Sequence, residues 1–119
     1  MSAGTWIGVA VLGGVGAVLR HVVDAGIAAR VRHTLPLGIF VVNITGAFAI
    51  GVLVGSGAGL DVTRILGAGL LGGYTTFSTW MLQVEVLRRG GRSHLAVTYV
   101  VASVVLGLAA VALGRSLAS

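Results

Sequence analysis

The fold of this chain is decided by the stretch GLLGGYTTFSTW, residues 69–80. Its two adjacent glycines, Gly72 and Gly73, lower helix propensity by about 2 kcal/mol in total relative to alanine. The threonine hydroxyls that follow can satisfy backbone groups that an interrupted helix leaves free. We therefore expect a discontinuous helix, with carbonyls exposed on one half and N–H groups on the other. The exposed carbonyls suit a bound cation.

The composition around this stretch is that of an integral membrane protein. The chain has 119 residues, of which 56% are hydrophobic and 9% are charged. Its mean hydropathy is +1.05. Soluble domains are about 25% charged, so this chain has too few charges to cover a water-facing surface. We expect a multi-pass protein of the cell membrane, surrounded by lipid.

Four apolar segments are long enough to cross a bilayer as helices. They cover about residues 5–23, 35–55, 65–87 and 95–114. Their apolar runs are continuous rather than alternating, which excludes β-spans. The predicted fold is therefore an all-α integral membrane domain of residues 1–119. It has four transmembrane helices, the third of them broken mid-membrane.

Small residues recur at a spacing of four within these spans. Examples are the pairs Gly51/Gly55, Gly69/Gly73, Gly4/Gly8 and Ser103/Gly107. Such pairs let helix backbones approach closely in lipid, and as a set they favour close packing. A bundle this small encloses little interior. If the protein conducts ions, we expect it to do so as an oligomer, for which a twofold dimer is the commonest choice.

Few polar residues lie inside the spans, and each is a candidate for function because its burial in hydrocarbon is costly. Asn43 lies near the middle of the second span, where its amide could hold helices together or offer donors to an anion. Tyr99, Ser103 and Gly107 share one stripe of the fourth span. Phe77 and Trp80 stand one turn apart beyond the expected break, and aromatic edges can meet an anion or simply fill space.

No pattern in the sequence indicates an enzyme or a nucleic-acid-binding protein. The three histidines, His21, His33 and His94, lie at span ends without metal-ligand spacing. The arginines fall between apolar runs rather than along one face. Small multidrug-type exporters have the same size, but they require a carboxylate in the first span, and residues 5–23 contain none.

Four motifs, in order along nearly the whole chain, resemble those of the Fluc (CrcB) family of small fluoride channels. They are GGVGAVLRH (13–21), PLGIFVVNITGAF (36–48), GLLGGYTTFST (69–79) and the fourth-span residues Tyr99 and Ser103. The third motif is the most specific. The residues alone do not distinguish fluoride from chloride, so that choice rests on the resemblance.

The resemblance implies an antiparallel dimer with two fluoride pathways, which passively exports cytoplasmic fluoride. It also implies a sodium ion at the dimer centre, held by the backbone carbonyls of Gly72 and Thr75. Arg20 would lie near an aqueous vestibule. The pathway residues that the resemblance implies are Asn43, Phe77, Trp80, Tyr99 and Ser103.

Three residues depart from the family pattern. Trp80 replaces a phenylalanine, Ile39 a threonine, and Gln83 a glutamate. Each change removes or alters a group of the pathway. The alternative to a conducting subunit is therefore a non-conducting or partly degenerate partner in a heterodimeric fluoride channel.

The loop arginines also bear on the choice between a homodimer and a heterodimer. An antiparallel homodimer needs a chain that inserts in both orientations, which requires balanced loop charge. Arg20 at the end of the first span would add to the more basic side. That side carries Arg30, Arg32, Arg88, Arg89 and Arg92, whereas the other has Arg64 and Arg115. A fixed orientation would require an oppositely oriented homologue, and both outcomes remain open.

Overall fold

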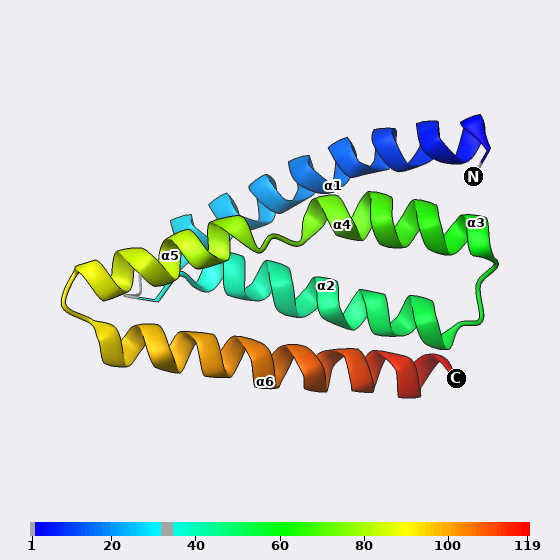
Figure 1. Cartoon of the computed structure of the whole chain (residues 1–119). Helices are drawn as coiled ribbons and strands as arrows, with labels where there is room; N and C mark the ends of the chain where they lie inside the picture. The colour runs from blue at the N-terminus through cyan, green and yellow to red at the C-terminus, as the bar shows by residue number, and fades with distance from the viewer. Residues whose placement is uncertain (1, 32–34) are drawn as a thin grey trace.

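The computed structural model describes residues 2–31 and 35–119, which form helices joined by short connections. Figure 1 shows the long helices running side by side along the molecule. Both termini and the α2–α3 connection lie at one end, and the α5–α6 turn lies at the other. The elements are α1 (Ala3–Arg30), α2 (Leu37–Gly55), α3 (Leu60–Thr63), the π-helix η1 (Arg64–Leu71), α4 (Gly72–Tyr74), α5 (Ser78–Arg89) and α6 (Ser93–Ala118).

Three helices, α1, α2 and α6, are long and apolar enough to cross a membrane. Large apolar side chains cover their outer faces; Leu108 is 68% exposed and Trp6 is 62% exposed. An exterior of this kind suits lipid rather than water. α1 ends at Arg30 rather than at Val23, where the first predicted span ended. Its 28 residues are about 42 Å long, more than a hydrocarbon core of about 30 Å requires.

The third predicted span is not one helix. Its residues form η1, α4 and α5, and the helical backbone stops at Tyr74 and resumes at Ser78. Thr75 is extended, with φ −77° and ψ 157°. The Thr75 hydroxyl donates to Leu71 O at 2.9 Å, one turn earlier. None of these pieces meets the length of a membrane-crossing helix by itself, so the count of four passes stays a prediction.

Glycines set how closely the helices pack. A Cβ on Gly51 of α2 would collide with Val111 O of α6, and a Cβ on Gly73 of α4 would collide with Gly13 O of α1. These contacts are between backbones, so no side-chain movement could relieve them. Not every predicted pair acts in this way: a Cβ on Gly107 would meet only Ile44 Cδ1, at 4.0 Å.

Several arginines lie at one end of the bundle, whereas Arg64 at the start of η1 and Arg115 in the last turn of α6 lie toward the other. Arg30 ends α1 and Arg88 and Arg89 end α5, and these two helix ends lie at the same end of the molecule (Figure 1). Glu85 forms an ion pair with both Arg88 and Arg89, the latter at 2.9 Å. Arg32 and His33 lie outside the described residues.

Candidate functional site

A cavity of about 330 Å³ lies where α2 and α6 face the non-helical residues between α4 and α5. It brings together four residues predicted for an anion pathway: Asn43 from α2, Phe77 and Trp80 from the break and α5, and Ser103 from α6. We call this cavity the break cavity. The rest of its wall includes the threonines Thr75 and Thr76 and the apolar residues Ile44, Ala47, Ile50, Val104 and Gly107.

Asn43 holds the break through two hydrogen bonds. Its Nδ2 donates to Thr76 O at 3.0 Å, and its Oδ1 accepts from Thr76 N at 2.9 Å. The side chain therefore supplies the partners that a continuous helix would have given to the N–H and C=O of Thr76. Because one amide has two N–H groups, a second Asn43 donor remains for the cavity. Holding helices together and offering a donor are thus compatible roles.

Two hydroxyl groups of the cavity also keep a proton to donate. Thr76 Oγ1 accepts from Thr79 N at 3.3 Å, and Ser103 Oγ accepts from Trp80 Nε1 at 3.1 Å. Within residues 2–31 and 35–119, neither hydroxyl donates a hydrogen bond to another group of the protein. By contrast, the Thr75 hydroxyl is committed to Leu71 O. The cavity therefore combines an amide donor and two hydroxyl donors with apolar walls.

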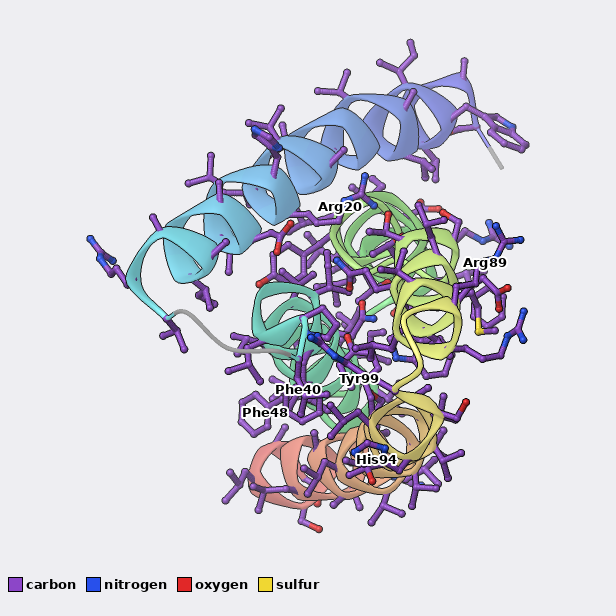
Figure 2. All side chains as sticks on the ribbon, turned by 90° about the vertical axis from the view of Figure 1, so that its left-hand side faces the viewer. Arg20, Phe40, Phe48, Arg89, His94 and Tyr99 are labelled. Atoms are coloured by element: carbon purple, nitrogen blue, oxygen red, sulfur yellow. The ribbon has the colours of Figure 1, made fainter. Side chains whose placement is uncertain are left out.

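Four aromatic rings form a series beside the cavity. Ring centroids are 5.7 Å apart for Phe77 and Trp80, 6.5 Å for Trp80 and Tyr99, and 6.2 Å for Tyr99 and Phe40. Figure 2 shows Phe40 and Tyr99 beside each other between α2 and α6. Tyr99 does not line the break cavity. Its hydroxyl donates to Pro36 O at 3.3 Å instead.

Arg20 reaches the same region from α1. Its Nη1 donates to Thr75 O at 3.5 Å, which is a long hydrogen bond. Figure 2 shows the side chain between α1 and the region of α4 and α5. Arg20 lies well inside α1, ten positions before the helix ends at Arg30. The guanidinium therefore places a positive charge beside the break.

The predicted cation ligands Gly72 and Thr75 differ in their surroundings. Thr76 N, which would donate to Gly72 O in a continuous helix, donates to Asn43 Oδ1 instead. Gly72 O is thus left without its helical partner, whereas Thr75 O accepts from Arg20. No group of three or more His, Asp or Glu side chains occurs in the described ranges.

The departures from the family pattern lie in different places. Ile39 is 2% exposed and does not line the break cavity. Gln83 lines a second cavity of about 440 Å³ together with Asp24, and its Oε1 is buried without a partner in the described part of the chain. Trp80 alone of the three lies in the break cavity.

Sequence reasoning did not single out Thr76 or Phe40. Thr76 was one of several threonines in the decisive stretch, and only the packing of α2 against it distinguishes it. The α2 residues Asn43, Ala47 and Ile50 do have helical spacing, so a face search from Asn43 would have found the cavity wall. No spacing or motif in the sequence sets Phe40 apart from the other apolar residues of its span.

Comparison with known proteins gives the family. Residues 7–115 match the model of the family described as CrcB-like protein, Camphor Resistance (CrcB). The "Fluoride-specific ion channel FluC 2" of Mycobacterium bovis is 45% identical over 118 residues, which is 99% of this chain and 94% of that protein. The "Fluoride-specific ion channel FluC 1" of Symbiobacterium thermophilum is 40% identical over 119 residues, 95% of this chain and 96% of that protein.

The chain therefore belongs to the CrcB family, as the sequence motifs predicted. Its relatives are named as ion channels, and a channel is not an enzyme class. The family and the three apolar helices together make this chain a multi-pass membrane protein.

Proposed function

We propose that this chain is a subunit of a fluoride-specific channel that exports cytoplasmic fluoride by passive conduction. The observation that carries the proposal is the break cavity, in which Asn43, Thr76 and Ser103 offer donors among apolar and aromatic walls. The names of relatives 40–45% identical to this chain support fluoride as the ion.

The chemistry of the cavity favours a small anion. An anion that leaves water needs several close donors in place of its hydration shell. The cavity supplies N–H and O–H groups, the rings of Phe77 and Trp80, whose edges carry positive charge, and the charge of Arg20 nearby. Among the described residues, its lining contains no carboxylate that would repel the ion.

The proposed assembly is an antiparallel dimer with two pathways. Each subunit would cross the membrane four times, and η1, α4 and α5 together would form the third pass. Irregular backbone at that depth must be buried by protein or line a cavity. Phe77 lines the cavity, yet it is 71% exposed in the single chain. A second subunit would cover the exposed part of this ring.

A sodium ion at the dimer centre is part of the proposal, and the residues present partly fit it. Unwound carbonyls are known ligands of sodium in membrane proteins, and Gly72 O has lost its helical partner. Thr75 O fits less well because it already accepts from the cationic Arg20. When bound, the cation would offset the carbonyl dipoles that meet at the axis.

The second candidate is a partner subunit in a heterodimer, which the charge distribution favours. The ends of α1 and α5 carry Arg30, Arg88 and Arg89, whereas Arg64 at the start of η1 and Arg115 lie near the other end of the bundle. A chain with this bias would insert with both termini outward.

This orientation can be tested with single cysteines that replace Ser2 or Ser93 and are labelled in intact cells. Labelling of Ser2 alone supports a fixed orientation, and equal labelling of both indicates dual topology and a homodimer.

The deciding experiment is anion efflux from liposomes that contain this chain alone. We expect rapid fluoride efflux and no chloride efflux above that of protein-free liposomes. Comparable fluxes of the two ions would contradict fluoride specificity. A dimeric protein that passes neither ion would favour the partner role in a heterodimer.

A further inference from the structure

The hydrogen bond from Trp80 to Ser103 assigns Trp80 a role beyond lining the cavity. Trp80 Nε1 donates to Ser103 Oγ at 3.1 Å, across the gap between α5 and α6. We propose that Trp80 is a positioning residue, which holds the Ser103 hydroxyl so that its proton points into the break cavity and donates to the permeating anion. This inference rests on the proposed function.

The conformation of Ser103 differs from that of Thr98 and Thr45, two other hydroxyl residues of these helices. Thr98, also on α6, donates to His94 O at 2.9 Å, and Thr45 on α2 donates to Val41 O at 2.7 Å. Such bonds to the carbonyl four residues earlier are the usual arrangement in membrane helices. For Ser103 that carbonyl is Tyr99 O, and the structure has no bond between them. Ser103 therefore accepts from Trp80 while its hydroxyl makes no bond to the carbonyl four residues earlier in α6.

The direction of the bond leaves the hydroxyl proton of Ser103 free for another acceptor. An indole Nε1–H can only donate, so Ser103 Oγ must be the acceptor. One lone pair of the oxygen is then occupied, and the O–H is left to find another acceptor. Ser103 shares the cavity wall with Val104 and Gly107 of its own helix and with Ile44 and Ala47 of α2, none of which carries a side-chain acceptor. An anion in the cavity would supply the missing one.

The indole has ring contacts with two neighbours, Phe77 and Tyr99. Phe77 lies 5.7 Å from it and Tyr99 lies 6.5 Å from it, centroid to centroid, with tilted ring planes. These contacts restrict rotation of the Trp80 side chain. A fixed donor on one side of Ser103 and an anion on the other would form a chain of two hydrogen bonds, each of which polarises the other. The Trp80 N–H should therefore respond to an anion that it does not touch.

The first test is nuclear magnetic resonance of the two indole N–H groups of the full chain in nanodiscs. The chain has two tryptophans, and Trp6 is 62% exposed near the start of α1, so it provides an internal control. We expect sodium fluoride to shift the Trp80 resonance downfield and leave Trp6 unchanged, with sodium chloride as the salt control. The shift should disappear in Ser103→Ala. A Trp80 resonance that does not move, or that still moves in Ser103→Ala, overturns the inference.

The second test is a double-mutant cycle on fluoride efflux with Trp80→Phe and Ser103→Ala. Phenylalanine keeps a ring between Phe77 and Tyr99 but has no donor. We expect about a tenfold loss of flux for Ser103→Ala in the native background, the size of a lost hydrogen bond to a charged group. In the Trp80→Phe background we expect the same change to cost less than about twofold, because the serine has already returned to its own helix.

The two tests separate this inference from the proposed function. Equal losses from Ser103→Ala in both backgrounds would mean that Trp80 acts independently, and would overturn the positioning role while leaving the channel intact. Absence of fluoride efflux from the unmodified chain would overturn the proposed function itself. The resonance experiment still reports on Trp80 in that case, because it measures binding rather than flux.

Discussion

The interface of α2 with α6 and the break between α4 and α5 satisfy their backbone hydrogen-bonding groups in opposite ways. At the α2–α6 interface both helices are continuous, so every backbone group inside them is bonded within its own helix. Gly51 and Gly114 bring the two backbones into contact. At the break, Thr76 N and Thr76 O instead depend on the side chain of Asn43.

The difference separates residues that shape the protein from residues that hold its site. The α2–α6 interface depends on the absence of side chains, so adding atoms there should damage folding. The break depends on particular side-chain groups, so exchanging one polar atom there should damage function more than folding. Substitutions in the two regions test this distinction.

Gly51→Val should remove folded protein almost entirely. The new side chain would collide with the backbone of α6 at Val111, and backbone cannot move aside without separating the helices. The measurement is the yield of monodisperse protein in detergent by size-exclusion chromatography. Gly26→Ala is the matched control, since a Cβ there meets nothing within 4 Å. A normal yield of Gly51→Val would contradict the importance of this contact.

Asn43→Asp should lower fluoride efflux by more than about 100-fold. The carboxylate keeps an acceptor for Thr76 N but loses the donor to Thr76 O, and if ionised it repels the anion. The measurement is liposome efflux of protein that still elutes as the native species. If Asn43 only holds helices together, Asn43→Ala should lower stability as much as Asn43→Asp does. A well-folded, fully conducting Asn43→Asp protein would falsify a role in the pathway.

Gly73→Ala and Gly72→Ala should differ although the residues are adjacent. A Cβ on Gly73 collides with Gly13 O, whereas a Cβ on Gly72 meets only Gly67 O at 3.5 Å, an ordinary contact. We expect Gly73→Ala to cost about 2 kcal/mol of stability and Gly72→Ala to leave the stability of the single chain unchanged. The measurement is the midpoint of thermal unfolding in detergent.

Gly72→Ala has a second expected outcome that concerns assembly. If Gly72 O holds a central cation between two subunits, the dimer of this variant should require more sodium than the native dimer. Dimer content measured with sodium replaced by a large organic cation tests this. If the variant dimer requires no more sodium than the native dimer, Gly72 is not a ligand of the cation.

Arg20→Gln should have the smallest effect, a loss of flux of about threefold. The guanidinium is 3.5 Å from Thr75 O, so the hydrogen bond itself is weak, and the expected loss comes from the removed positive charge near the cavity. Arg20→Lys keeps the charge and serves as the control. Equal losses in both variants would assign the effect to the shape of the guanidinium rather than to its charge.

The sequence by itself determined the membrane class and the family. Low charge and long apolar runs exclude a water-exposed fold whatever the tertiary structure is, and the motif around Gly72 and Gly73 is specific enough to identify relatives. It also named four residues that the structure brings into one cavity, Asn43, Phe77, Trp80 and Ser103. Asn43 and Ser103 were conspicuous as polar residues inside apolar spans, and Phe77 and Trp80 as rings one turn apart just beyond the two glycines.

Only the tertiary structure decided which polar group meets which. Helical spacing places Tyr99 and Ser103 on one stripe, yet the Tyr99 hydroxyl turns to Pro36 O while Ser103 accepts from Trp80. Helical spacing also gives no reason for Arg20 of α1 to reach Thr75 O, 55 residues later. Hydrogen bonds of this kind depend on the distance between helices, which Gly13, Gly51 and Gly73 set by backbone contact. A periodic pattern gives the face on which a residue lies, but not how far away the facing helix is or which of its atoms points back.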